Sequence, residues 1–363
     1  MRQPSSYLSA GVVALHYLTC RHGFEATLLA ELRRNAITAT SPCAAVARIE
    51  ATAPPDPTYA LQVLPHAVEV QGVSIKMLAD GAAKAIDAEL LSAAPRGALT
   101  THVLVPDTLR GVPPAKAKLG RRCEAVADQL RHTLRGRFAA ARHRRECDAV
   151  SDTPLVLQLL LLEPELLVIS LAPSVRHRSG VGYWPVRLLG GFVDCSLDGD
   201  MPSSAYRKLL ESFVLMHLQP RPGDQCVDLG ACPGGWTAAI RRQCDATVTA
   251  VDRSPLDPAL DTDAAVTFVQ GDAFAFEPPG GAADWMVSDV AAYPERCVEL
   301  IERWSARRWA RRMVVTMKFT SEPDFDAIDE ARRAAEANSY RFRAMHHFSN
   351  KNEVSLMLDA LGS

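Results

Sequence analysis

The sequence predicts an α/β protein whose last part, residues 203–363, forms a parallel sheet that is covered by helices and ends in an antiparallel hairpin. Apolar strands alternate with helices over residues 225–338, as they do when crossover helices join parallel strands. A glycine-rich segment, VDLGACPGGW (227–236), stands where the first strand turns into the first helix. Only four residues separate the final strands, YRFRAMHHF (340–348) and EVSLMLDAL (353–361), so these two strands must be antiparallel.

The amino-terminal half predicts two smaller α+β regions. Residues 1–70 hold a strand at 12–20, a helix at 24–35 and a loop at 51–60. Residues 71–175 are expected to run helix, loop, basic helix and hairpin, since Glu163-Pro164-Glu165 interrupts the apolar run 155–171. Residues 176–202 are rich in glycine and proline and predict a linker to a domain at 203–363.

The carboxy-terminal elements follow one another with short connections. Their expected positions are an amphipathic helix at 203–218, with Leu209, Leu210, Phe213, Val214 and Leu218 on one side, strands at 225–230, 246–251, 265–270, 284–288 and 313–317, and helices from 234, at 295–310 and at about 323–338. A doubly wound parallel sheet that ends in an antiparallel hairpin is the topology of Rossmann-like methyltransferases. Ordinary dinucleotide-binding folds lack that hairpin.

Composition sets the limits on location and partners. The chain of 363 residues has a net charge of −2, so any surface that binds nucleic acid must be local. The longest apolar run is interrupted well before the roughly 20 residues that a membrane span needs, so no membrane association is expected. Nine scattered cysteines without a C-x-x-C pair, and no evident signal peptide, predict reduced thiols and a cytoplasmic protein.

The glycine-rich segment predicts a cofactor site. Gly230, Gly234 and Gly235 allow a tight turn and a close approach of a ligand to the backbone. The segment is neither G-x-G-x-x-G nor a phosphate loop, because no Lys-Ser/Thr pair follows it. S-adenosylmethionine fits this loop, since its methionine part needs backbone donors and acceptors and carries no phosphate.

Two acidic residues at neighbouring strand ends agree with that cofactor. Asp252 ends the second strand and can accept from both hydroxyls of an adenosine ribose. Asp272 follows the third strand and can accept from the adenine amino group. Either residue alone can equally be a turn former; it is their combination with the glycine-rich loop that favours the cofactor.

Cys232 raises the alternative of a nucleophilic cysteine, as in cytosine-C5 methylation. Such a cysteine must lie beside the substrate base, whereas Cys232 lies in the predicted cofactor loop. The nucleophile is therefore the weaker interpretation.

Polar residues at the carboxyl edge of the predicted sheet form a candidate catalytic group. Asp289 ends the fourth strand and Lys318 the fifth, and these strands are adjacent in this topology. Glu353 begins the antiparallel last strand, so it lies at the same edge. Lys208 lies on the helix before the first strand, which can pack across that edge.

Two lysines and two carboxylates suit the methylation of a ribose 2′-hydroxyl. A neutral amine at Lys318 can take the hydroxyl proton while the carboxylates orient and balance the lysines. The sulfonium is already a good leaving group, so no metal is expected. The alternative is a structural salt-bridge network. The segment after the fourth strand, SDVAAYPE (288–295), lacks the Pro-Pro of amino methylases and the Pro-Cys of cytosine-C5 enzymes.

Five segments resemble FtsJ-like 2′-O-ribose methyltransferases, namely DLGACPGGW, PSSAYRKLLESF, WMVSDV, TMKFT and NEVSLML. Among these enzymes the chain is most similar to the RlmM family, which methylates a cytidine ribose of 23S rRNA, and LTCRHGFEATLLAEL (18–32) resembles the amino-terminal segment of that family. The resemblance implies Lys318 as proton acceptor, completed by Lys208, Asp289 and Glu353. It implies cofactor contacts at Ala205, Cys232, Pro233, Gly234, Gly235, Asp252, Asp272 and Asp289. Ser204 and FTSEPDF (319–325) depart from the family pattern, which bears on the nucleotide target.

A basic stretch predicts contact with RNA. Between residues 110 and 145 only two acids, Glu124 and Asp128, accompany eleven basic residues, at positions 110, 116, 118, 121, 122, 131, 135, 137, 142, 144 and 145. Such a run can track phosphates, although a solvated helix face is the usual explanation of a charge run. Its position matches the RNA-binding THUMP domain of the family, so we expect residues 71–175 to be THUMP-like and to read RNA shape.

The sequence leaves two other functions open. The chain could be a non-catalytic protein of the same fold that binds S-adenosylmethionine or RNA, or a methyltransferase that acts on a substrate other than RNA. It does not specify the nucleotide or the oligomeric state, for which a monomer is plausible.

Overall fold

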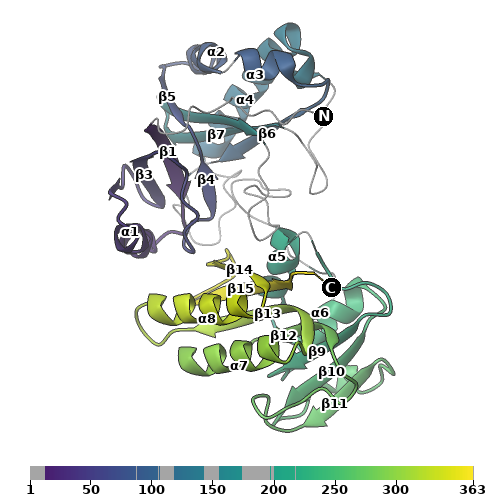
Figure 1. Cartoon of the computed structure of the whole chain (residues 1–363). Helices are drawn as coiled ribbons and strands as arrows, with labels where there is room; N and C mark the ends of the chain where they lie inside the picture. Colours follow the sequence, from purple (N-terminus) through teal and green to yellow (C-terminus); the bar gives the residue numbers. More distant parts are fainter. Residues whose placement is uncertain are drawn as a thin grey trace. The chain divides into compact units, whose positions relative to one another are not determined.

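A computed structural model describes residues 13–86, 88–104, 106, 118–142, 155–173, 197, 200–216 and 218–362. These residues form two compact units, an amino-terminal unit that ends with residue 173 and a carboxy-terminal unit that begins with residue 197 (Figure 1). The predicted linker lies almost entirely outside the described residues. The domain boundaries drawn from the sequence stay predictions.

The amino-terminal unit begins with an antiparallel sheet in the order β2-β3-β1-β4. Its elements are β1 (Ala14–Thr19), α1 (Glu25–Arg34), β2 (Ala39–Thr40), β3 (Val46–Ala51) and β4 (Gln62–Leu64). The strand and the helix expected at its start are both present. Strands β2 to β4 were not predicted. Strands β2 and β4 have only two and three residues, whereas β3 was missed although its last five residues alternate between apolar and polar.

A second sheet of the same unit has the order β5-β8-β7-β6. Its elements are β5 (Val68–Gln71), α2 (Ile75–Ala85), α3 (Ala88–Ala93), β6 (Leu99–Leu104), α4 (Lys118–Arg137), β7 (Leu155–Glu163) and β8 (Leu166–Pro173). The predicted hairpin is present as β7 and β8. The loop expected before the basic helix is wrong in part, because β6 pairs in parallel with β7 there.

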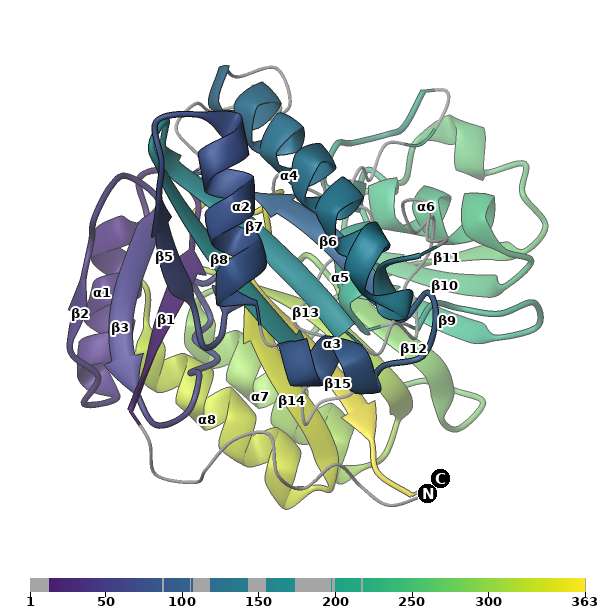
Figure 2. The same ribbon diagram turned by 90° about the horizontal axis from the view of Figure 1, so that it is seen from above.

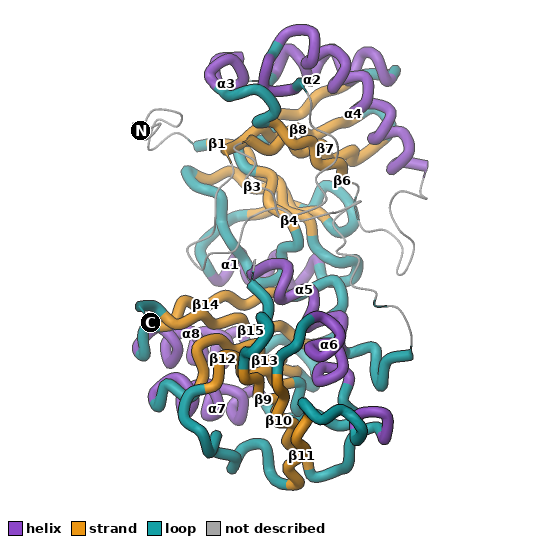
Figure 3. The backbone as a smooth tube through the Cα atoms, turned by 90° about the vertical axis from the view of Figure 1, so that its right-hand side faces the viewer, coloured by secondary structure: helices purple, strands orange, loops and turns teal. Residues whose placement is uncertain are grey.

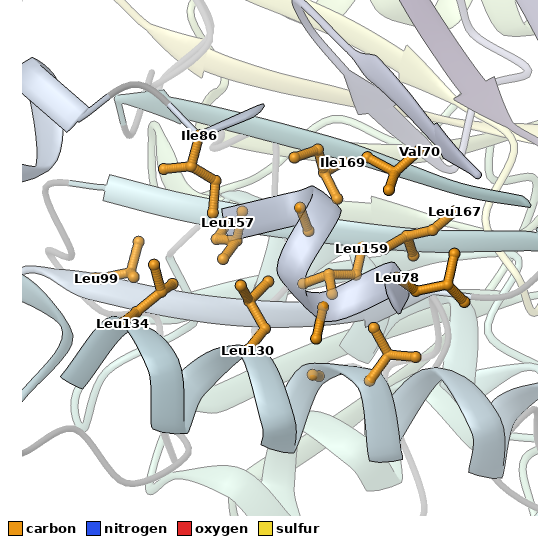
Figure 4. Close-up of a cluster of buried hydrophobic side chains, with 14 of the residues drawn as sticks. Val70, Leu78, Ile86, Leu99, Leu130, Leu134, Leu157, Leu159, Leu167 and Ile169 are labelled. Carbon is orange, nitrogen blue, oxygen red and sulfur yellow. The ribbon is translucent and has the colours of Figure 1, made fainter. Parts of the chain in front are cut away.

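Helices α2 and α4 cover one face of this second sheet (Figure 2). They bury leucine, valine and alanine side chains against the inner face of the strands (Figure 4). On α4 the buried positions recur at helical spacing, namely Cys123, Val126, Ala127, Leu130 and Leu134. The polar residues of α4 are thereby directed away from the core.

The carboxy-terminal unit is a seven-stranded sheet in the order β11-β10-β9-β12-β13-β15-β14. Its strands are β9 (Gln225–Leu229), β10 (Thr247–Asp252), β11 (Val266–Gln270), β12 (Ala283–Ser288), β13 (Ala310–Lys318), β14 (Tyr340–Met345) and β15 (Glu353–Ala360). Strands β9 to β13 are parallel, and β15 is antiparallel to both of its neighbours. The predicted topology is confirmed.

Helices cover both faces of this sheet (Figure 3). Helices α7 (Pro294–Ala306) and α8 (Phe325–Ala337) lie on one face, and α5 (Tyr206–Met216) and α6 (Gly235–Gln243) lie on the other. Helix α5 is shorter than expected, so Leu218 lies outside it. Strand β13 is longer than expected and ends at Lys318. Among the described residues, no helix is both long enough and apolar enough to cross a membrane.

Candidate active site

The carboxyl edge of the carboxy-terminal sheet gathers two lysines and two carboxylates. Lys208 Nζ lies 2.8 Å and 2.9 Å from the two carboxylate oxygens of Asp289, and it lies 3.1 Å from Glu353 Oε1. Lys318 Nζ lies 3.2 Å from Asp289 Oδ1 and donates to the Asp289 carbonyl oxygen at 2.7 Å. Asp289 therefore contacts both amines, and the four residues that the sequence placed at this edge do meet.

The fold explains why residues so far apart in the chain converge. Asp289 directly follows β12, whose neighbour β13 ends at Lys318. Strand β15 runs the other way, and its first residue, Glu353, is paired in register with Lys318. Lys208 comes from α5, which packs against β15 and α6.

The two lysines have different surroundings. The side chain of Lys208 is only 8% exposed and contacts both carboxylates, whereas that of Lys318 is 30% exposed and contacts Asp289 alone among the four. With all four groups charged, the set is neutral. Loss of one proton from the more accessible amine leaves a net charge of −1, which suits a site that receives a sulfonium.

The glycine-rich loop keeps its backbone close to its neighbours. Gly230 has a φ of +78°, and a Cβ there would lie 2.8 Å from the Cβ of Val290. Gly234 has a φ of +109°, and a Cβ there would lie 2.3 Å from a methyl carbon of Leu260. Helix α6 begins at Gly235 without a side-chain cap, so its first turn can present N–H groups to an anion such as a carboxylate.

The two predicted cofactor acids lie at the ends of β10 and β11. Asp252 Oδ2 accepts from the Cys232 N–H at 3.0 Å, which ties the end of β10 to the glycine-rich loop. Asp272 accepts from the Phe274 N–H at 2.9 Å and pairs with Arg253 at 2.6 Å. These two contacts lower the pKa of Asp272, so it is present as an oxygen acceptor.

The remaining predicted cofactor residues surround the same loop. The Ala205 carbonyl oxygen accepts from Trp236 Nε1 at 2.9 Å, which fixes the start of α5 to the start of α6. The Pro233 carbonyl oxygen accepts from the Asp257 N–H at 2.9 Å. Cys232 is exposed, and desolvation together with Asp252 raises the pKa of its thiol, which argues against a thiolate nucleophile.

Asp228, within the glycine-rich segment, was not among the site residues predicted from the sequence. It is buried in β9 and accepts from Thr237 Oγ1 at 2.7 Å, which joins the strand to the first turn of α6. Burial, with Asp289 and Asp252 nearby, raises its pKa to about 7. An aspartate inside an otherwise apolar strand was the available signal. Among the described residues, no cluster of His, Cys, Asp and Glu is arranged to hold a metal ion.

Comparison with known proteins places this site in a class. The family model of the FtsJ-like methyltransferases matches residues 201–337, which include the glycine-rich loop, Lys208, Asp289 and Lys318. The chain is 30% identical over 290 residues to the ribosomal RNA large subunit methyltransferase M of Halorhodospira halophila, a match that covers 78% of this chain and 76% of that protein. The proteins of the same name from Methylococcus capsulatus and Shewanella pealeana are 34% and 31% identical, over 51% and 50% of their lengths.

Fold and site together define a methyltransferase of the FtsJ-like class, with S-adenosylmethionine as its cofactor. The chain belongs to the family of the ribosomal RNA large subunit methyltransferase M. The solved structure of TrmN from Thermus thermophilus covers 96% of the chain at 14% identity, and its TM-score of 0.33 is too low to support any inference.

Proposed function

We propose that this protein transfers a methyl group from S-adenosylmethionine to a ribose 2′-hydroxyl of ribosomal RNA, at a cytidine of the 23S-type large-subunit RNA. The observation that carries the proposal is the contact of both lysines with Asp289, at the edge of the sheet beside the glycine-rich loop. The substrate is inferred from relatives that are named for large-subunit ribosomal RNA.

Lys318 is the proposed proton acceptor. A ribose hydroxyl is a poor nucleophile until its proton is removed, and a neutral amine within hydrogen-bond reach can remove it during attack. Lys318 suits this role because it is the more exposed lysine and has one carboxylate partner fewer than Lys208. When it is bound, the cofactor supplies an electrophilic methyl group on a positively charged sulfur.

The other three residues orient Lys318 and balance its charge. Lys208 lies between Asp289 and Glu353, and its proposed role is to hold these two carboxylates in place beside Lys318. Asp289 accepts from Lys318 through its carboxylate and through its carbonyl oxygen, so it fixes where the amine points. A fixed amine is favourable because a misplacement of about 1 Å can cost about 100-fold in rate.

The cofactor is proposed to lie against the residues implied by the family resemblance. Asp252 and Asp272 would accept from its ribose and adenine, and the first turn of α6 would face its carboxylate. The other proposed contacts are Ala205, Cys232, Pro233, Gly234, Gly235 and Asp289.

Helix α4 is the proposed contact for the RNA backbone, within the region 71–175 that is expected to be THUMP-like. Its inner side is buried, and the exposed basic residues of α4 and of the turn after it are Lys118, Arg121, Arg135, Arg137 and Arg142. Lysines and arginines that neutralise phosphates release counterions, so the affinity for RNA should fall as salt rises. Positions 110, 116, 144 and 145 of the basic run lie outside the described residues.

The proposal is tested by incubating the full chain with large-subunit rRNA and labelled S-adenosylmethionine, and then mapping the 2′-O-methyl groups. We expect one methylated cytidine, and no transfer when that nucleotide is replaced by its 2′-deoxy form. Transfer that survives this replacement would refute the ribose as acceptor. Labelling of protein or small molecules but not of RNA would favour a different substrate, and cofactor binding without any transfer would favour the non-catalytic alternative.

A further inference from the structure

The loop between β14 and β15, residues 346–352, makes polar contacts with two other elements of the site. We propose that this loop, here named the positioning loop, sets the relative positions of Lys208, Lys318 and Glu353, with Glu211 and Asn352 as positioning residues. The inference rests on the proposed function for the roles of those three residues. Its contacts are independent of that function.

The first contact joins the positioning loop to α5. The buried carboxylate of Glu211 accepts from two consecutive backbone N–H groups, those of Phe348 at 2.8 Å and Ser349 at 3.1 Å. A carboxylate can accept both bonds at once, and hydrogen bonds to a charged group are stronger than neutral ones. Glu211 lies three residues after Lys208 on α5, so the bonds that hold Glu211 also limit where Lys208 can lie.

A second contact joins the same two elements. Ser212 Oγ donates to the Lys208 carbonyl oxygen at 2.9 Å and lies 2.8 Å from Nε2 of the buried His347. A carbonyl oxygen can only accept, so the hydroxyl proton of Ser212 goes to it and the imidazole donates from Nε2. Burial lowers the pKa of His347 well below its usual value, which agrees with a neutral ring.

The third contact joins the positioning loop to the end of β13. The side-chain amide of Asn352 donates to the carbonyl oxygens of Phe319 at 3.0 Å and Ser321 at 2.6 Å. The Phe319 N–H donates in turn to the Asn352 carbonyl oxygen at 2.9 Å. Asn352 immediately precedes Glu353, and Phe319 immediately follows Lys318, so this contact extends the register of the two strands past the site.

These contacts together explain how residues from three elements keep one geometry. Asp289 accepts hydrogen bonds from both lysines, but those bonds do not by themselves fix where α5 and the start of β15 lie. The positioning loop adds directional hydrogen bonds on both sides, from α5 and from the end of β13. Loss of one contact should move an amine or a carboxylate without removing the groups that react.

The test compares Glu211→Gln with Glu31→Gln as a matched control. Glu31 is also buried and also accepts from two consecutive backbone N–H groups, those of Thr58 at 2.6 Å and Tyr59 at 3.0 Å, but it lies in the amino-terminal unit. Methyl transfer to rRNA, affinity for S-adenosylmethionine, thermal unfolding and amide hydrogen exchange are measured for both variants of the full chain.

We expect Glu211→Gln to lower kcat by about 10- to 100-fold, the range for a small misplacement of reacting groups. The KM for S-adenosylmethionine should stay within about twofold, because the cofactor contacts lie elsewhere. Glu31→Gln should leave kcat within about twofold even if both variants unfold at similarly lowered temperatures. Equal changes in kcat for the two variants, or none for either, would overturn the positioning role.

Two further measurements cover the remaining outcomes. If Glu211→Gln does not fold, Asn352→Ala tests the same loop from its other side, with the same expected loss of kcat. Hydrogen exchange does not depend on catalysis: Glu211→Gln should expose the amides of residues 347–349 and also that of Phe319, whereas Glu31→Gln should expose only those near residue 58. If wild type fails to methylate rRNA, the proposed function is wrong. If Phe319 stays protected in Glu211→Gln, the positioning loop does not couple the two sides and the inference is wrong.

Discussion

The two ends of the β13–β15 pair carry oppositely charged residues in register, but in different arrangements. At the amino end of β13, Arg312 is opposite Asp359, and Arg312 Nε lies 3.3 Å from Asp359 Oδ1. The guanidinium of Arg312 also lies 5.3 Å from the ring of Trp285. This end has the form of an ordinary cross-strand ion pair supported by an aromatic ring.

At the other end, Lys318 is opposite Glu353, yet the lysine contacts Asp289 and the glutamate contacts Lys208. The ion-pair partners of these two cross-strand residues therefore come from other elements. Asp289 follows β12, and Lys208 belongs to α5. Simple stabilisation of the sheet does not require this. We infer that strand register alone gives a simple cross-strand ion pair. A lysine that pairs instead with residues from other elements indicates a catalytic role.

The largest effect on the rate of methyl transfer is expected for Lys318→Ala, at the carboxyl end of β13. Removal of a general base costs about 100- to 10,000-fold in rate, so single-turnover methyl transfer to rRNA should fall by that factor. Lys318→Arg should be similarly inactive, because a guanidinium does not give up its proton near neutral pH. Binding of S-adenosylmethionine should persist in both variants, as calorimetry can measure. Full activity of Lys318→Arg would rule out Lys318 as the proton acceptor.

A second test exchanges one carboxylate at each end. Asp289→Asn leaves a single oxygen acceptor where the carboxylate served two lysines, so methyl transfer should fall by about 100-fold. Asp359→Asn removes the equivalent charge at the amino end and should leave the rate unchanged. Steady-state rates of the two variants, measured side by side, decide the matter, and a similar loss in both would mean that the ends do not differ in function.

Cofactor affinity should depend on the carboxyl ends of the other strands. Asp252→Ala removes the proposed ribose acceptor and should weaken binding of S-adenosylmethionine by about 10- to 100-fold, the equivalent of a hydrogen bond to a charged group. Asp284, near the amino end of β12, accepts from the Gln225 N–H at 2.9 Å and provides the control. Calorimetric titration of Asp252→Ala and Asp284→Ala should separate them, and equal affinities would remove Asp252 from the cofactor site.

Much of this arrangement was predictable from the sequence. In the carboxy-terminal unit the alternation of strands and helices and the short final connection predicted a parallel sheet that ends in an antiparallel hairpin, and this topology places Asp289, Lys318 and Glu353 at one edge. In the amino-terminal unit the same reasoning missed β6, although helix α4 joins it to its parallel neighbour β7. Three consecutive polar residues, 100–102, interrupt the apolar residues there, so no alternating pattern marks β6. Its partner β7 comes only after the long helix α4, at a distance that local sequence patterns do not reach.

The partner of each charged group was not predictable. Sequence placed Lys208 near the site, but whether it would contact Asp289, Glu353 or both depends on side-chain conformations. The role of Glu211 was equally hidden, because it accepts from backbone N–H groups 137 and 138 residues away, and any residue except proline supplies such a group. A glutamate among leucines was a sign of a buried partner, although it did not say which one.

Substitutions near the two ends should also differ in how they change the pH dependence of the free energy of unfolding. His347, in the positioning loop, has a pKa lowered by burial, so below about pH 6.5 the unfolded chain takes up a proton that the folded chain does not. The free energy of unfolding should therefore fall as pH drops below about 6.5, by up to roughly 1.4 kcal/mol per pH unit until the folded pKa is reached. His347→Leu should reduce this slope, to which His16 and His66 also contribute because burial lowers their pKa values, whereas Arg312→Ala should keep it, as urea unfolding at a series of pH values can show. A slope that is unchanged in His347→Leu would assign it to another group.

The smallest effect is expected for the coupling free energy between Arg312 and Asp359, at the amino end of β13. It is obtained in a double-mutant cycle from the unfolding free energies of Arg312→Ala, Asp359→Ala and the double variant. Both side chains are partly open to solvent, and ion pairs of this kind contribute about 0.2–1 kcal/mol. The same cycle with Lys208→Ala and Asp289→Ala should give a coupling free energy several times larger, because those groups are more buried and share two hydrogen bonds. Added salt should reduce the first coupling more than the second, since exposed charges are screened more effectively. Equal coupling free energies with equal salt dependence would mean that both ends hold structural ion pairs of the same kind. The catalytic role of the carboxyl end would then be supported only by the rates of the Lys318 and Asp289 variants.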